Sequence, residues 1–269
     1  MRSSQSTQHN RNAWQELARN GHRLARTVTA EELKSPLERV DSLGWLGGDI
    51  RGWQVLCLAA GGGRHGPLYT AAGANVTVVD FSSAMLDLDR SVQRDTGLSY
   101  QLIETCMSDL SGLSDSQFDL VIHPVSTCYL PDISRVFVEV ARVTRPGGLY
   151  VSQHKQPSSL QASLLPGSAG KYTIEHDCYS GQPAQSETRH TNNLIREPET
   201  NEYVHRWETI VGGICNAGFV IEALVEPNHA DRAAAAGSFG HRSCFLPPYV
   251  RIKARRRAET ASSKPSLIY

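Results

Sequence analysis

A glycine-rich turn followed by an acidic residue is the part of this 269-residue sequence that most directly suggests chemistry. The apolar run 54–59 predicts a buried strand, and Gly61, Gly63 and Gly66 follow it with G-x-G-x-x-G spacing. Glycines allow a tight turn and the close approach of a ligand to its backbone. Asp80 ends the next expected strand, where a carboxylate can accept both ribose hydroxyls of an adenosine. The pair predicts a site for an adenosine-bearing cofactor, either a nicotinamide dinucleotide or another member of that class.

The elements that must position these residues follow from the hydropathy pattern, in which apolar runs of strand length alternate with helical spacing. Strands are expected at residues 54–59, 76–80, 100–103, 120–123, 149–153, 219–225 and 249–254. A helix over 134–145 is expected to stop at Pro146-Gly147-Gly148. Short apolar strands separated by helices indicate a Rossmann-like, doubly wound α/β sheet that is mainly parallel and has helices on both faces. The last two strands lack a helical crossover, so an antiparallel edge is expected.

Two segments lie outside this alternation. The helical spacing of Trp14, Leu17 and Leu24 predicts an N-terminal helical cap. The region after residue 155 is rich in Pro, Gly, Ser and Gln, with strand-like patterns only at 171–174 and 193–196 and an expected helix over 202–216. We interpret it as an insertion with little burial rather than as an independent domain.

The sequence therefore predicts one domain over residues 1–269. Its expected parts are a cap (1–45), a cofactor-binding core (50–155), an insertion that covers the acceptor (156–205), a C-terminal helix and strands (206–254) and a frayed tail (255–269) that includes the basic run Arg255–Arg257.

Composition excludes several classes of protein. Basic and acidic residues number 27 each, which argues against nucleic acid as the main partner. No apolar run is long enough to cross a membrane. The six cysteines form no Cys-x-x-Cys pair, which indicates a cytoplasmic protein without a disulfide framework, and the ten histidines show no metal-ligand spacing.

Motifs beyond the glycine turn narrow the choice of cofactor. Phe118-Asp119-Leu120-Val121-Ile122 opens the fourth strand, and Leu130-Pro131-Asp132 follows it. Arg145-Pro146-Gly147-Gly148 precedes the fifth strand, and Ala217-Gly218-Phe219 precedes the sixth. With these motifs at these spacings, the chain resembles a class I S-adenosylmethionine-dependent methyltransferase of the small-molecule type. The resemblance implies a seven-stranded sheet whose final strand inserts antiparallel.

The resemblance also implies a cofactor site at the carboxyl ends of the strands. The backbone of residues 59–63 would line the amino-acid end of S-adenosylmethionine, and Asp80 would hold the ribose. Phe81 and Met85 would lie near the adenine. The full implied set is Trp14, Ala59, Ala60, Gly61, Gly63, Asp80, Phe81, Met85, Cys106, Met107 and His123.

Two cysteines depart from the pattern of the family, which usually has an acid where this chain has Cys57 and another where it has Cys106. The first loss would weaken contacts to the ammonium group of the cofactor. The second would remove an acceptor for the adenine amine, which Asp109, three residues on, could replace.

Catalytic candidates must lie where ligands bind in open α/β sheets, at the carboxyl ends of the strands. His154 ends the fifth strand and is expected to titrate near neutrality, and Tyr129 lies in the loop after the fourth strand. Methyl transfer needs such a base only when the acceptor carries a proton. His65 is interpreted as part of the start of a helix.

We therefore predict an S-adenosylmethionine-dependent methyltransferase that acts on an oxygen, nitrogen or carbon atom of a small molecule, without a metal. Two alternatives remain open at this point. One is an NAD(P)-dependent oxidoreductase, and the other is a non-catalytic protein that binds an adenosine cofactor.

Overall fold

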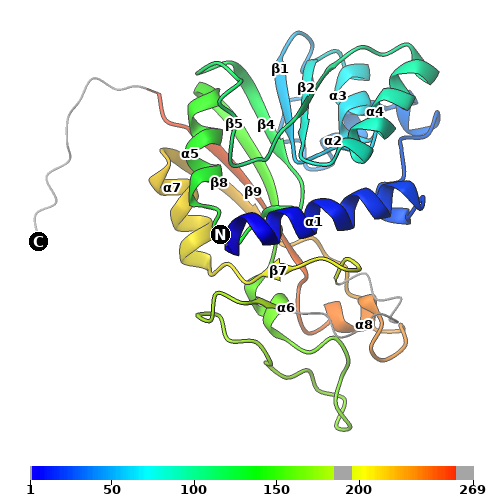
Figure 1. The fold of residues 1–269 in the computed structure, drawn as a ribbon, viewed down its shortest axis with the longest axis vertical. Helices are drawn as coiled ribbons and strands as arrows, with labels where there is room; N and C mark the ends of the chain where they lie inside the picture. The colour runs from blue at the N-terminus through cyan, green and yellow to red at the C-terminus, as the bar shows by residue number, and fades with distance from the viewer. Residues whose placement is uncertain (1, 185–195, 259–269) are drawn as a thin grey trace, which may run out of the picture.

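A seven-stranded mixed sheet forms the centre of the molecule (Figure 1). The computed structural model describes residues 2–184 and 196–258. The strand order is β3-β2-β1-β4-β5-β9-β8. The strands are β1 (Gln54–Leu58), β2 (Asn75–Asp80), β3 (Gln101–Glu104), β4 (Phe118–His123), β5 (Thr144–Lys155), β8 (Phe219–Val225) and β9 (Tyr249–Arg256). The first five are mutually parallel, and β9 lies antiparallel between β5 and β8, which confirms the predicted fold class.

Helices cover both faces of the sheet because its central strands are apolar on both sides. In β1 and β2, every residue after the first is buried. One core cluster joins the sheet to α5 (Ser134–Val143) and α7 (Gly213–Asn216). The other joins it to α2 (Pro36–Val40), α3 (His65–Ala71) and α4 (Ser83–Thr96). The two-sided burial leaves the carboxyl ends of the strands as the open edge.

The N-terminal helix α1 (Arg2–Arg19) crosses below this open edge and lies between the sheet and the insertion (Figure 1). Within its described residues, 156–184 and 196–205, the insertion contains short elements only. The remaining elements are η1 (Arg23–Ala25), η2 (Glu32–Lys34), η3 (Thr127–Tyr129), α6 (Pro157–Gln161), β6 (Pro183–Ala184), β7 (Glu202–Tyr203), the π-helical turn η4 (Glu208–Gly212) and α8 (Phe239–Ser243).

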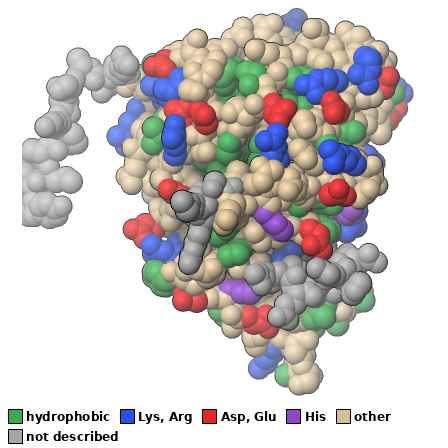
Figure 2. All heavy atoms as spheres, in the orientation of Figure 1, with side chains coloured by type: hydrophobic (Ala, Val, Ile, Leu, Met, Phe, Trp, Pro, Cys, Tyr) green, Lys and Arg blue, Asp and Glu red, His purple; other side chains and the backbone are tan. Residues whose placement is uncertain are grey.

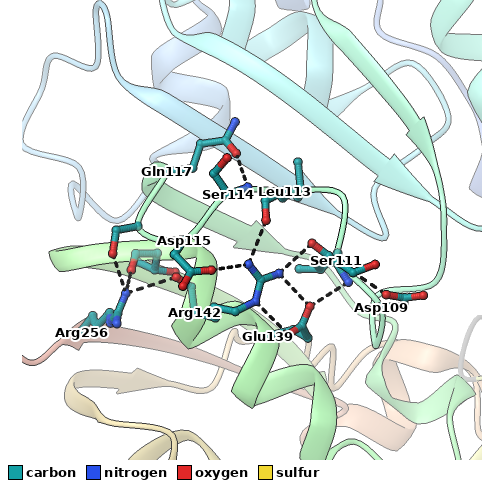
Figure 3. A network of polar contacts seen from close by, with 12 residues as sticks. Asp109, Ser111, Leu113, Ser114, Asp115, Gln117, Glu139, Arg142 and Arg256 are labelled. Carbon is teal, nitrogen blue, oxygen red and sulfur yellow. Dashed lines mark hydrogen bonds and ion pairs between the residues drawn. The ribbon is translucent and has the colours of Figure 1, made fainter.

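A polar network ties the connection between β3 and β4 to α5 (Figure 3). The guanidinium of Arg142 pairs with Glu139 at 2.9 Å and with Asp115 at 2.6 Å. It also donates to the carbonyl oxygens of Leu113 and Leu110 at 2.8 and 2.7 Å. These bonds fix a long connection that has no helix of its own.

Three predicted boundaries are wrong. The helix expected over 134–145 ends at Val143, because β5 begins at Thr144 and the Pro146-Gly147-Gly148 turn forms a bulge within it. The helix expected from residue 202 begins later, since β7 pairs with β6 first. The tail does not begin at Arg255, because β9 extends to Arg256 and Arg255 pairs with a carboxylate of β8.

The insertion also differs from the prediction. Residues 171–174 form no strand and contribute one isolated bridge, between Ala162 and Ile174. Of the expected strand at 193–196, residues 193–195 lie outside the described residues. The expectation of little burial holds for the exposed middle, residues 165–182, but not for Arg196 or Glu202, which are buried.

The distribution of surface charge and the character of the helices can be compared with what nucleic-acid binding and membrane crossing require. On the face shown in Figure 2, Lys and Arg side chains are interspersed with Asp and Glu side chains rather than gathered in one basic patch. Within residues 2–184 and 196–258, no helix has both the length and the apolar character that crossing a membrane requires.

Candidate functional site

The glycine turn lies at the carboxyl end of β1 and has unusual backbone geometry. Ala59 has a φ of 48°, which side chains rarely permit, and Gly62 and Gly63 have φ values of 114° and 65°. The carbonyl of Gly63 accepts from the amide of Val28 at 2.8 Å, which fastens the chain after α1 to the turn. Strained backbone of this kind is typical of functional sites.

Asp80, the predicted ribose ligand, lies against this turn at the end of β2. Its carboxylate accepts from the amide of Gly61 at 3.0 Å and from the amide of Ser82 at 2.9 Å. Burial raises the pKa of Asp80 to about 6, although these amide donors oppose the rise. A Cβ on Gly61 would lie 3.0 Å from the Asp80 carboxylate, so only glycine lets the acid approach the turn this closely.

Asp89 is a functional candidate that the sequence argument missed. It lies on α4 and its side chain is fully buried beneath the turn, where it accepts from the amides of Gly62, at 2.8 Å, and Gly63. The Tyr100 hydroxyl donates to the same carboxylate at 3.1 Å. Burial raises the pKa of Asp89 to about 6. The charge of Asp89 also contributes to raising the pKa of the Cys57 thiol. An acid from α4 therefore lies near Cys57, the position on β1 where the family usually has an acid.

Two of the four residues implied for the adenine end line a cavity of about 340 Å³, whereas Met85 and Met107 do not. Phe81 and Cys106 line it from the ends of β2 and β3, and α1 forms the opposite wall. Met85 and Met107 are both buried, and the Ser126 hydroxyl lies 3.6 Å from the Met107 sulfur. The residues that line the cavity are Thr7, Gln8, Arg11, Phe81, Glu104, Thr105, Cys106 and Ser108. Asp109 is not among them.

A second cavity, of about 190 Å³, lies on the α2 and α3 side of the sheet. It begins at Arg64 and His65, directly after the glycine turn, and passes His123 at the end of β4. It extends across β5 to Arg251 on β9. His65 therefore starts α3, as predicted, and also faces a cavity.

The predicted catalytic His154 is fully buried. Its Nδ1 lies 2.9 Å from the Thr127 hydroxyl and its Nε2 lies 2.8 Å from the Ser152 hydroxyl. Burial lowers the pKa of His154 well below its usual value, so the expectation of titration near neutrality is wrong. His123 is similarly enclosed, between the hydroxyls of Tyr150 and Ser126 at 2.8 and 2.7 Å.

Tyr129 and Trp14 are brought together, as a T-shaped ring pair whose centroids are 5.6 Å apart. Tyr129 is buried, and burial raises the pKa of its hydroxyl well above the usual value. Its hydroxyl shares a hydrogen bond with the carboxylate of Glu197. The pair joins α1 to the loop after β4, at the edge where the cofactor residues lie.

A buried charge cluster fastens the insertion to the end of β5. The Lys155 ammonium lies 2.5 Å from Glu197 and 2.9 Å from Glu202, and all three side chains are at least nine-tenths buried. Burial raises the pKa of Glu202 to about 7, and one of its oxygens has no hydrogen-bond partner among the described residues. The cluster carries two carboxylates against one cation.

The insertion is also bonded to α1. The Asn10 side chain donates to the carbonyl oxygens of Tyr129 and Asn201 at 2.8 and 2.9 Å, and it accepts from the amide of Asn201 at 2.7 Å. The Tyr203 hydroxyl donates to Ser6 at 2.7 Å. Helix α1 and residues 201–203 of the insertion therefore form one roof over the carboxyl edge.

Comparison with known proteins decides the family. The model of the methyltransferase domain matches residues 56–152. The crystal structure of an S-adenosylmethionine-dependent methyltransferase from Mesorhizobium loti has the same fold, with a TM-score of 0.60 and 24% identity over 77% of this chain and 93% of that one. The uncharacterized methyltransferase YbaJ of Bacillus subtilis is 32% identical over 177 residues, which are 66% of this chain and 69% of that protein. The chain belongs to the S-adenosylmethionine-dependent methyltransferase family.

Membership of this family settles the reaction class and the cofactor. The methyltransferase uses S-adenosylmethionine, and the two alternatives, an oxidoreductase and a non-catalytic binding protein, are set aside. A further relative, 24-methylenesterol C-methyltransferase 2 of Oryza sativa, is 35% identical over 38% of this chain and 30% of that protein. Among the described residues, no group of three or more His, Cys, Asp or Glu side chains could hold a metal ion.

Proposed function

We propose that this methyltransferase holds S-adenosylmethionine along the carboxyl ends of β1 to β4 and methylates a small molecule. The observation that carries the proposal is the contact between the Asp80 carboxylate and the Gly61 amide. The proposal is supported by a carboxylate that lies against a tight glycine turn, where a Cβ would come within 3.0 Å of it. One cavity is lined by Phe81, which follows Asp80, and the other by Arg64, which follows the turn. The residues present therefore fit the cofactor.

Each part of the site has a proposed task. Phe81, Cys106 and Met107 would enclose the adenine, Met85 and Trp14 would pack behind the turn, and Asp80 would accept from the ribose. The backbone of Ala59, Ala60, Gly61 and Gly63, with His123, would line the amino-acid end. The cofactor supplies a methyl group on a sulfonium whose leaving group is neutral, so the protein contributes mainly positioning.

The size of the second cavity supports a small acceptor. Its volume of about 190 Å³ equals that of roughly six water molecules in the liquid, which suits a small molecule. We propose an oxygen or nitrogen atom as the methyl acceptor. A carbon acceptor is the alternative, because the sterol enzyme that the chain resembles over part of its length is named a C-methyltransferase. The roof of α1 and residues 201–203 would exclude water, with Tyr129 as part of its wall. A catalytic role for His154 and Tyr129 stays a prediction. We propose that both also position the loop after β4, through the contact of His154 with Thr127 and that of Tyr129 with Trp14.

Titration calorimetry with S-adenosylmethionine, S-adenosylhomocysteine and NAD tests the cofactor site. We expect both sulfur compounds to bind and NAD not to bind. Release of S-adenosylhomocysteine in the presence of a panel of small acceptors tests turnover. Tight binding of NAD, or no binding of S-adenosylmethionine, would contradict the proposal.

Replacing Asp80 by alanine should weaken cofactor binding by about 1–3 kcal/mol, the scale of a charge-assisted hydrogen bond. Because the pKa of Asp80 is raised to about 6, its carboxylate gains a proton and loses acceptor strength as the pH falls through that value. Wild-type affinity should therefore decrease from pH 7 to pH 5, and Asp80→Ala should show a flatter profile. Equal affinities, or parallel profiles, would remove Asp80 from the ribose site.

Replacing Asp89 by asparagine should weaken S-adenosylhomocysteine binding about tenfold, or about 1.4 kcal/mol. The uncharged amide can accept from one turn amide but not as strongly from two, so the turn loses part of its order. Asp87→Asn is the matched control, because Asp87 lies on the same helix and its side chain is exposed. Identical affinities of the two variants would show that the turn holds its shape without Asp89.

A further inference from the structure

The second cavity is lined by apolar as well as polar side chains. Val40 and Leu46 line it from the α2 side, and Ile122 and Val151 line it from β4 and β5. Arg251 closes the far end from β9. A pocket that combines these apolar side chains with a few charged and polar groups suits a small molecule that has an apolar body and a polar group.

The charges that line this cavity are predominantly positive. The lining contains three arginines, Arg39, Arg64 and Arg251, and one carboxylate, that of Asp41. The Asp41 carboxylate already accepts from the amides of Trp45, at 2.6 Å, and Leu46, at 2.9 Å. Burial lowers the pKa of His65 to about 4 and that of His123 to about 3, so both histidines are neutral at pH 7. The lining therefore carries an excess of cations.

The three arginines differ in their partners. Arg64 pairs with Glu32 at 2.7 Å. Within the described part of the chain, Arg39 and Arg251 form no ion pair with a carboxylate, and Arg39 lies exposed at the rim. Arg251 is half-buried, and its Nε donates to the Gln153 side chain at 2.7 Å, which fixes the guanidinium across the end of the cavity. Arg251 is therefore the fixed cation that still lacks an anion.

Strand order separates this cation from the cofactor site. Arg251 pairs in register with Gln153 of β5, and β4 lies between β5 and β1. At roughly 4.8 Å a strand, Arg251 is about 14 Å from the strand that bears the glycine turn and about 10 Å from β4. The amino-acid end of the cofactor is held at the turn, where Arg64 lies, so Arg251 remains for the other substrate.

We propose that the acceptor is a small organic acid with an apolar, ring-sized body, whose carboxylate binds Arg251 and whose methylated atom lies at the opposite end, near the glycine turn. This inference rests on the proposed function. The nucleophilic atom of the acceptor forms a bond to the methyl carbon while the carbon–sulfur bond breaks, and that electron pair stays on sulfur. An acceptor O–H or N–H loses its proton to solvent. The bound carboxylate itself is not methylated, because it lies at the wrong end of the cavity.

The test uses two acids, benzoate and 3-phenylpropanoate, and their uncharged amides as probes. Calorimetry is carried out on the protein saturated with S-adenosylhomocysteine. Each acid should bind at least tenfold more tightly than its amide. Arg251→Gln should abolish this preference, and Arg251→Lys should retain part of it. Arg255→Gln is the control on the same strand, since Arg255 pairs with Glu222 outside the cavity.

Arg251→Gln should leave the affinity for S-adenosylhomocysteine within twofold of wild type. Equal binding of acids and amides by the wild type, or an unchanged preference in Arg251→Gln, would overturn the acid proposal while the cofactor site stands. A tenfold loss of S-adenosylhomocysteine affinity in Arg251→Gln would assign this end of the cavity to the cofactor and also overturn it. Failure of the wild type to bind S-adenosylhomocysteine would instead overturn the proposed cofactor placement, and the inference with it.

Discussion

Replacing Lys155 by methionine is expected to lower the free energy of unfolding by about 3–5 kcal/mol at pH 7. The change leaves the carboxylates of Glu197 and Glu202 buried against each other without the cation that pairs with both. Lowering the pH should reduce the loss, since the pKa of Glu202 is already raised to about 7 and protonation removes the uncompensated charge. Urea unfolding followed by tryptophan fluorescence at pH 5 and pH 8 measures both effects.

Two further variants make this result specific to the cluster. Lys253→Met removes a lysine whose partner, Glu222, also pairs with Arg255, so it should cost less than about 1 kcal/mol. Adding Glu197→Gln and Glu202→Gln to Lys155→Met should restore most of the lost stability, because no buried charge remains. Equal losses for Lys155→Met and Lys253→Met would show that the cluster is solvated in solution.

Replacing Gly61 by valine should abolish measurable binding of S-adenosylmethionine, a loss of at least about 100-fold, or about 2.7 kcal/mol. From the sequence, the glycines of this turn are expected to allow the close approach of a ligand to the backbone. The structure gives a different reason, because the new Cβ would lie 3.0 Å from Asp80, whose carboxylate is held by the amide of Ser82 and cannot move aside freely.

The matched control for this variant is Gly112→Val, because a Cβ at Gly112 meets no atom within 4 Å. Both proteins should show wild-type circular dichroism, and only Gly61→Val should fail in calorimetry. Normal cofactor affinity of Gly61→Val would show that the turn is not the site.

The sheet could be predicted because its central strands are apolar on both faces, so that each appears as a short continuous run. The turn and Asp80 could be predicted because their spacing along the chain is fixed by one strand, one turn and one helix. The end of the helix before β5 could not, since Thr144 pairs with Phe118 across a bulge, and this pairing depends on a distant strand.

Contacts between side chains that are distant in the sequence were not predicted either. In the sequence, Asp89 is one of several acids on an amphipathic helix. Its spacing from Met85, Leu86 and Val92 places it on the buried face of α4. This helical spacing is the sequence signal that could have identified it. The contact of Lys155 with Glu197 joins residues 42 positions apart, through an insertion without periodicity. His154 ends the fifth strand, as expected of a catalytic base. Its side chain is nevertheless buried, with its two ring nitrogens bonded to the hydroxyls of Thr127 and Ser152.

The bonds between Asn10 and Asn201 have a consequence for the order in which the protein is assembled. They join residues 191 positions apart, so α1 leaves the ribosome long before its partner exists. Closing a loop of that length lowers the conformational entropy of the chain, and this loss is offset only once the contacts between the two ends have formed. The core sheet from β1 to β5 has all its strands once residue 155 has been made, whereas the roof over its edge needs residues 201–203. The edge where we propose that the cofactor binds is therefore among the last parts of the molecule to close, and a chain that stops before residue 200 leaves α1 without these partners.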